Sequence, residues 1–89
     1  MENGLGGRVA VVAGATRGIG LSVAYALAGA GASLVINGRD AEAVTAAVDE
    51  IAGGGEVEAV GVVGPASEVA EEIVATAVRR FGALDVAIN

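Results

Sequence analysis

Short runs of small apolar residues alternate along this chain with stretches in which apolar residues recur at helical spacing. Four runs predict β-strands, at 8–14, 33–37, 56–63 and 84–89. Three stretches between them predict α-helices, at 18–30, 40–55 and 67–82. This alternation predicts an α/β fold of three layers, in which right-handed crossovers build a parallel four-stranded sheet with helices on both faces. Because the chain has 89 residues and no linker interrupts it, we expect one small domain over 1–89.

The ends and faces of the predicted helices carry further signals. The helix over 18–30 is apolar almost all the way round, so we expect it to be largely buried. The second helix has Asp40 as its N-cap and one polar face. The third has Ser67 as its N-cap and ends with Arg79 and Arg80, whose positive charges suit the negative end of the helix dipole.

The composition excludes several classes of function. The chain carries a formal charge of -6, with five Arg and no Lys, which argues against nucleic acid or an acidic membrane surface as a partner. Since Cys and His are absent, we expect no disulfide, no zinc site and no imidazole catalysis. No apolar stretch approaches the roughly 18 residues of a membrane span, and residues 1–8 lack a leader pattern. We therefore expect a soluble protein, with the cytoplasm as its default location.

The segment GATRGIG, residues 14–20, lies where the first predicted strand passes into the first helix. Gly14 would permit a tight turn, Gly18 would let the helix start approach a pyrophosphate, and Gly20 would allow close packing of helix and sheet. Free N–H groups and the positive end of the helix dipole would then bind the anion. The Lys and Ser/Thr of a P-loop are absent, which disfavours hydrolysis of a magnesium nucleotide. The alternative is that these glycines only allow a tight connection.

Three features together resemble the N-terminal half of the short-chain dehydrogenase/reductase family: GATRGIG after VAVVA, INGR after the second strand, and an Asn at the end of the fourth. The resemblance covers essentially the whole chain and implies a Rossmann-like half-domain with strand order 3-2-1-4 that binds a dinucleotide. Ala13 replaces the Thr of the family's TGxxxGIG loop, and Asn89 is the only residue present of the family's NNAG. The cofactor-binding residues that the resemblance implies are Gly14, Thr16, Arg17, Gly18, Ile19, Gly20, Arg39 and Asn89.

The type of dinucleotide depends on the end of the second strand. An acidic residue there would bind the ribose hydroxyls of NAD, whereas a small residue with a nearby Arg accommodates the 2′-phosphate of NADP. Gly38 stands at that position and Arg39 follows, while Arg17 occupies the place where NADP-preferring members of the family carry a basic residue. These residues predict NADP as the cofactor, with two guanidinium groups on one phosphate. The alternative is that both arginines are ordinary solvated residues, with Arg39 paired to Asp40 or Glu42.

One departure from the family concerns the adenine. Family members usually carry an Asp just after the third strand, which accepts a hydrogen bond from the adenine amine. Here Gly64 and Pro65 stand where that Asp is expected, so either the contact is missing or the loop is shorter.

The catalytic residues of the family, a Ser and a Tyr-x-x-x-Lys pair, are not found in this chain. It has no Lys, and its single Tyr, Tyr25, lies inside the first helix, where we expect it to pack. Ser22, Ser33 and Ser67 have no base nearby. We therefore expect no catalytic residue and no turnover by the chain alone, although its parent would transfer a hydride between nicotinamide and a carbonyl or alcohol carbon. A non-catalytic nucleotide-binding module and a self-associating fold fragment remain as alternatives.

The predicted position of the fourth strand bears on assembly. In the order 3-2-1-4 this strand lies at the edge of the sheet, and the third helix carries an apolar stripe that we expect to add to the exposed surface. The stripe consists of Val69, Ile73, Ala77 and Phe81. We expect a homo-oligomer held through the fourth strand or the third helix. The alternative is a marginal monomer kept in solution by its charge.

Overall fold

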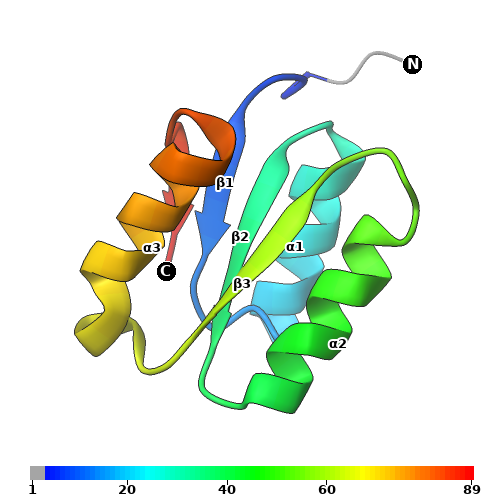
Figure 1. Ribbon diagram of the computed structural model, residues 1–89. Helices are drawn as coiled ribbons and strands as arrows, with labels where there is room; N and C mark the ends of the chain where they lie inside the picture. The colour runs from blue at the N-terminus through cyan, green and yellow to red at the C-terminus, as the bar shows by residue number, and fades with distance from the viewer. Residues whose placement is uncertain (1–3) are drawn as a thin grey trace.

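The computed structural model describes residues 4–89, which form one parallel sheet with helices on both of its faces (Figure 1). The strands are β1 (Val9–Val12), β2 (Ser33–Gly38), β3 (Ala59–Val63) and β4 (Val86–Ile88). The helices are α1 (Gly18–Gly29), α2 (Ala41–Ala52) and α3 (Ala66–Phe81). The order in the sheet is β3-β2-β1-β4, and each neighbouring pair is parallel. The predicted α/β fold and the predicted strand order are confirmed.

Alternation along the strands divides the apolar core between the two faces of the sheet. Leu34 and Ile36 of β2 belong to the cluster that includes residues of α1 and α2. Val35, between them, belongs to a second cluster with Ile73 and Ala77 of α3. Figure 1 shows the same division, with α1 and α2 on one side of the sheet and α3 on the other. Both faces of β1 and β2 are therefore covered, which explains why these strands are apolar throughout.

Helix α1 is less buried than its composition predicts. Ala24 is the one residue of this helix that is buried, while Ile19 and Tyr25 are 84% and 41% exposed. One side of α1 packs in the cluster on its face of the sheet, and the side that carries Ile19 faces solvent. The packed residues are Leu21, Val23, Ala24, Leu27 and Ala28. The prediction of a largely buried helix is wrong. One side of α1 packs on the sheet, and no other element of the described residues covers its opposite side, however apolar that side is.

The ends of α2 and α3 differ in how well the sequence predicts them. The Asp40 side chain caps α2 by accepting a hydrogen bond of 2.9 Å from the Glu42 N–H. The predicted Ser67 cap of α3 is wrong, because the helix begins at Ala66, directly after Pro65, and no side chain caps that end. The φ of Pro65 is -62°, so the proline ring itself fixes the backbone direction from which the helix starts.

Asp85 sets the alignment of β4 against β1. Its carboxylate accepts a hydrogen bond of 2.9 Å from the Val9 N–H, and its own N–H donates to the Val9 carbonyl at 2.8 Å. The same carboxylate lies 3.6 Å from the guanidinium of Arg8. At the other end of the pair, the Ala13 N–H donates to the Ile88 carbonyl at 2.9 Å. The carboxyl ends of β1 and β4 are therefore level, which brings the residue after β4 to the edge where the glycine loop begins.

The prediction about exposed apolar surface is confirmed for the edge position of β4 and is wrong for the stripe of α3. The order of the strands places β4 at the edge of the sheet, as predicted. The predicted stripe of α3 is not exposed: Ile73 and Ala77 are 6% and 0% exposed and pack in the second cluster. The large apolar residues of α3 that are exposed are instead Val74 and Val78, at 47% and 51%. The prediction about the stripe is wrong because the sheet of this same chain covers it.

No helix in residues 4–89 is both long enough and apolar enough to cross a membrane. The expectation about a leader at residues 1–8 falls partly on residues 1–3, which lie outside the part of the chain that the structure describes.

Candidate functional site

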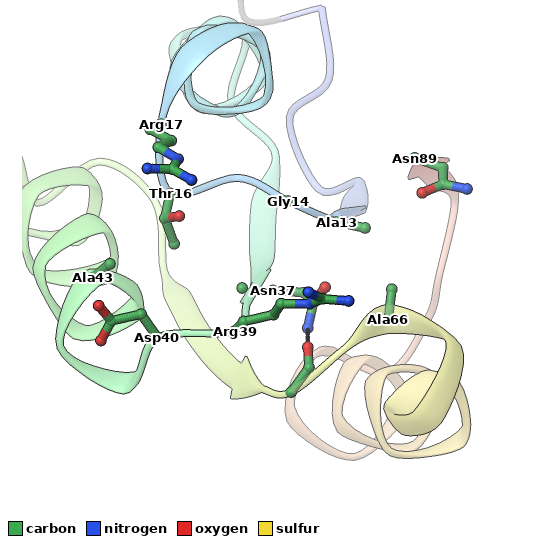
Figure 2. Close-up of a pocket in the computed structure, with 12 residues that line it drawn as sticks. Ala13, Gly14, Thr16, Arg17, Asn37, Arg39, Asp40, Ala43, Ala66 and Asn89 are labelled. Carbon is green, nitrogen blue, oxygen red and sulfur yellow. Dashed lines mark hydrogen bonds between the residues drawn. The ribbon is translucent and has the colours of Figure 1, made fainter.

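A cleft of about 600 Å³ lies at the carboxyl ends of the strands (Figure 2). All four strand ends contribute to it, because in a parallel sheet these ends lie along one edge. β1 sits between β2 and β4. The strand order therefore reverses at β1, with β2 and β3 added on one side of it and β4 on the other. Open α/β sheets bind ligands at such a point. The lining residues are Ala13, Gly14, Thr16, Arg17, Asn37, Gly38, Arg39, Asp40, Ala43, Gly64, Ala66 and Asn89.

The glycine loop between β1 and α1 has a conformation that requires glycine. Gly14 and Gly18 have φ values of 64° and 62°, in the left-handed region that other residues rarely adopt. Between them, Ala15 is fully buried and its N–H donates to the Asn37 carbonyl at 3.0 Å. The loop is thus anchored to the end of β2 while its two glycines make the turns.

The third glycine of the loop has a different role from the predicted one. A Cβ on Gly20 would meet the carbonyl oxygen of Gly14 and would lie 3.2 Å from the Ala15 Cα. The close approach that Gly20 allows is therefore between the first turn of α1 and its own loop, not between helix and sheet. The first turn of α1 folds back onto the loop, which fixes the direction in which the helix start points.

The start of α1 is suited to an anion. The first hydrogen bond of the helix runs from the Leu21 N–H to the Arg17 carbonyl, so the amides of the preceding residues have no partner within the helix. No side chain caps this end, and the first turn contains no acidic residue. Free amide groups, the positive end of the helix dipole and the absence of a nearby carboxylate in that turn all favour a phosphate.

The two arginines of the cleft lie on different sides of it. Arg17 and Arg39 are both exposed, and neither forms an ion pair with a carboxylate in residues 4–89. The pairing of Arg39 with Asp40 or Glu42, the alternative left open by the sequence, is not formed. Figure 2 shows Arg17 above the glycine loop and Arg39 reaching from the end of β2 toward Ala66. The guanidinium groups do not converge on one point, so a clamp on one phosphate requires a change of rotamer.

Gly38 has a packing reason to be glycine. A Cβ at this position would lie 2.6 Å from Cγ2 of Thr16 and 3.1 Å from Cγ2 of Val44. The end of β2 is thus in close contact with the glycine loop on one side and with α2 on the other. A side chain here would force the Thr16 side chain to move, so this packing disfavours an acidic residue at the position.

Asn37 is a residue of the cleft that the sequence analysis missed. It is 2% exposed, and its Nδ2 donates to the carbonyl oxygens of Val62 and Gly64, both at 3.0 Å. These bonds tie the end of β2 to the end of β3, and Figure 2 draws the one to Gly64. A signal was present in the sequence, because a polar side chain at the end of an otherwise apolar buried strand needs hydrogen-bond partners.

The structure brings five of the predicted site residues together and leaves three outside the cleft lining. Gly14, Thr16, Arg17, Arg39 and Asn89 line the cleft. Gly18, Ile19 and Gly20 form the first turn of α1 and are not among the lining residues. The hydroxyl residues for which we expect no catalytic role also lie outside the cleft lining; they are Ser22, Tyr25, Ser33 and Ser67.

A comparison with protein families settles the affiliation that this geometry suggests. The family model described as short chain dehydrogenase matches residues 8–89. The chain belongs to the short-chain dehydrogenase family. The glycine loop, the cleft at the carboxyl ends of the strands and the order β3-β2-β1-β4 are thus those of a short-chain dehydrogenase fold.

Two relatives of this short-chain dehydrogenase chain are much longer than it is. An uncharacterized oxidoreductase of Methylorubrum extorquens is 44% identical over 87 residues, and the match covers 96% of this chain and 35% of the relative. The D-beta-hydroxybutyrate dehydrogenase of Cupriavidus necator is 41% identical over 90 residues, covering 96% of this chain and 33% of the relative. The chain therefore spans about a third of the length of these relatives.

A solved structure gives the same result for the fold. The crystal structure of L-sorbose reductase from Gluconobacter frateurii, complexed with NADPH and L-sorbose, superposes with a TM-score of 0.91 at 28% sequence identity. The superposition covers the whole of this chain and 35% of the reductase. The fold of residues 4–89 is thus that of the corresponding third of an NADPH-complexed enzyme of this architecture.

Proposed function

We propose that residues 1–89 are the N-terminal, NADP(H)-binding part of a short-chain oxidoreductase. The whole protein would transfer a hydride between nicotinamide and a carbonyl or alcohol carbon. One observation carries the proposal: Arg17 and Arg39, without carboxylate partners among the described residues, line the same cleft as the glycine loop. Two unpaired cations beside a helix start form a site for a ligand with more than one phosphate.

Different residues of the cleft bind different parts of the proposed cofactor. The amide groups at the start of α1 bind the pyrophosphate, since Gly14 and Gly18 leave that end open. Arg39, and Arg17 after a change of rotamer, bind the 2′-phosphate. NADPH, when bound, supplies the hydride. The chain's own contribution is to hold the adenosine and pyrophosphate part at the carboxyl edge of the sheet.

Asp40 supports a second candidate, a preference for NAD(H). Its carboxylate lines the cleft one residue after Arg39 and would repel a 2′-phosphate or accept hydrogen bonds from ribose hydroxyls. Two observations favour NADP(H) nonetheless. The carboxylate already accepts the Glu42 N–H as the cap of α2, and Figure 2 shows it beside Ala43, on the α2 side of the cleft.

Catalysis by the chain alone is not part of the proposal. The sequence has no Lys, and Tyr25 lies on the partly exposed side of α1, outside the cleft lining. The cleft offers no side chain suited to give a proton to a carbonyl oxygen, since its titratable groups are two arginines and a capping carboxylate. A non-catalytic nucleotide-binding module remains the alternative from another class of function.

Self-association is a further part of the proposal. An apolar groove of about 470 Å³ runs between α3 and the edge strand β4, and its lining includes Val74, Leu84 and Ala87. The outer edge of β4 has no neighbouring strand among residues 4–89. Two copies that met through β4 about a twofold axis would pair antiparallel and continue the sheet across both chains.

The cofactor assignment is tested by calorimetry with NADPH and NADH on the wild-type chain and on Arg39→Asp. We expect the wild type to bind NADPH at least about tenfold more tightly than NADH, the size of one charged hydrogen-bond pair, and Arg39→Asp to reverse the order. Arg79→Asp is the matched control, because it makes the same charge change in the last turn of α3, outside the cleft. Equal affinities in the wild type, or an equal loss in both variants, would contradict the assignment.

A further inference from the structure

The side-chain amide of Asn37 has a fixed orientation. Both hydrogens of Nδ2 are used, one for the Val62 carbonyl and one for the Gly64 carbonyl, each at 3.0 Å. The reversed amide would place Oδ1 against these two acceptors, which is repulsive, so the bonds determine which way the group faces. Oδ1 must therefore point away from the end of β3.

The Oδ1 atom of Asn37 is left open to the cleft. It accepts no hydrogen bond from the described residues, whose side-chain bonds to Asn37 both involve Nδ2. Every polar side-chain atom of residues 4–89 that is shut off from solvent has a hydrogen-bond partner. Oδ1 is therefore not shut off, although the residue as a whole is 2% exposed, and the space it reaches is the cleft that Asn37 lines. A buried, immobilised acceptor with free lone pairs faces the site.

The position of this acceptor indicates the ligand group that it meets. Nδ2 of Asn37 lies 3.0 Å from the carbonyl oxygen of Gly64, directly after β3, where neither Gly64 nor Pro65 offers a side-chain acceptor. Asn37 is also two residues from Arg39, which the proposed function places on the 2′-phosphate. The adenine is attached to the same ribose as that phosphate, and its edge carries an exocyclic amine that donates hydrogen bonds.

We propose that Asn37 recognises the adenine of the cofactor, with Oδ1 accepting a hydrogen bond from the exocyclic amine. This inference rests on the proposed binding of NADP(H). The two bonds from Nδ2 of Asn37 to the end of β3 hold the acceptor in place before the ligand arrives. Asn89, the other amide of the cleft, is exposed and has no side-chain hydrogen bond within residues 4–89, so it lacks this preorganisation.

The test compares NADP with deamino-NADP, in which a carbonyl oxygen replaces the adenine amine, by calorimetry on the full chain. The wild type should prefer NADP by about fivefold or more, the range expected for one net hydrogen bond plus the repulsion between two facing oxygens. In Asn37→Ala the preference should fall below about twofold, because the acceptor is gone. The ratio of the two affinities is the readout, so a general loosening of the cleft, which weakens both ligands alike, does not imitate the effect.

Thr76→Ala is the matched control, because Thr76 is a buried polar residue of α3 outside the cleft lining, and the variant should keep the wild-type ratio. If Asn37→Ala does not fold, the wild type still gives an answer by NMR. NADP should then shift the Nδ2 proton resonances of Asn37, and deamino-NADP should shift them much less.

Equal affinity of the wild type for both ligands, or a preference that survives Asn37→Ala, would overturn the role of Asn37. Those results would leave the cofactor assignment intact as long as Arg39→Asp still reversed the order of NADPH and NADH. Loss of all dinucleotide binding by the wild type would overturn both.

Discussion

Gly20→Ala should destabilise the chain although it places a good helix former inside α1. The added Cβ would meet the Gly14 carbonyl oxygen and lie 3.0 Å from the Gly14 carbonyl carbon and 3.2 Å from the Ala15 Cα. These are backbone atoms, so no flexible side chain can move aside and the loop or the first turn must shift. Overpacking of this kind costs about 1–3 kcal/mol, and the helix propensity of Ala offsets about 1 kcal/mol of it. We expect a net loss of up to about 2 kcal/mol.

The same helix provides the control. A Cβ on Gly29 would have no heavy atom within 4 Å, so Gly29→Ala should stabilise the chain by up to about 1 kcal/mol. Urea unfolding followed by circular dichroism measures both variants. With a slope of about 1 kcal/mol per molar urea for a chain of this size, the midpoint of Gly20→Ala should lie below that of Gly29→Ala by up to about 3 M. A Gly20→Ala chain as stable as Gly29→Ala would refute the argument that the loop and the first turn of α1 are in close contact.

Three further outcomes follow from the structure. Asp85→Ala should lower the free energy of unfolding by about 1 kcal/mol, because the hydrogen bond to Val9 is lost. Arg8→Ala should lower it by less than about 0.5 kcal/mol, because the ion pair of Arg8 is exposed. A lower urea midpoint for Arg8→Ala than for Asp85→Ala would contradict this. Light scattering behind size exclusion should give a mass above that of the monomer for the wild type and the monomer mass for Ala87→Lys at the exposed face of β4; a wild-type monomer at tens of micromolar ends the proposal of self-association. No oxidation of NADPH should follow with any carbonyl substrate; turnover that survives repurification and disappears in Tyr25→Phe would show that Tyr25 is catalytic.

The arrangement of strands could be predicted because it depends on local patterns. Each apolar run ends in Gly or Asn or is followed directly by Gly, and the spacing between runs leaves room for one helix, so alternation alone leads to the parallel sheet. The Asp40 cap was equally predictable, because its bond to Glu42 joins residues two positions apart.

The failures concern contacts between distant parts of the chain. Ile19 is 84% exposed. Its burial would require another element to pack on that side of α1, and the sequence of α1 does not show whether one does. The stripe of α3 was expected to add exposed surface, yet Ile73 and Ala77 pack on the sheet of the same chain. Ser67 does not cap α3, because the helix already begins at Ala66, directly after Pro65.

The candidate site was predictable to a similar extent. The glycine loop and the arginines carry local signatures, and the cleft brings Gly14, Arg17 and Arg39 together. The role of Asn37 was not predictable in this way, since its partners Val62 and Gly64 are backbone carbonyls some 25 residues further along the chain. A backbone acceptor has no sequence signature, so the partner of a buried Asn becomes known only when the strand register is known.

Cofactor binding in the cleft is tested most directly by titrating the isotopically labelled chain with NADPH and following the backbone amide resonances. We expect the large shifts to cluster in three segments that meet at the cleft, residues 13–20, 37–40 and 64–66. The amides of α1 that precede the first helical bond should move most, because they bind the pyrophosphate directly. Shifts confined to the groove between α3 and β4, or no saturable shifts at all, would contradict the claim that this cleft binds the cofactor.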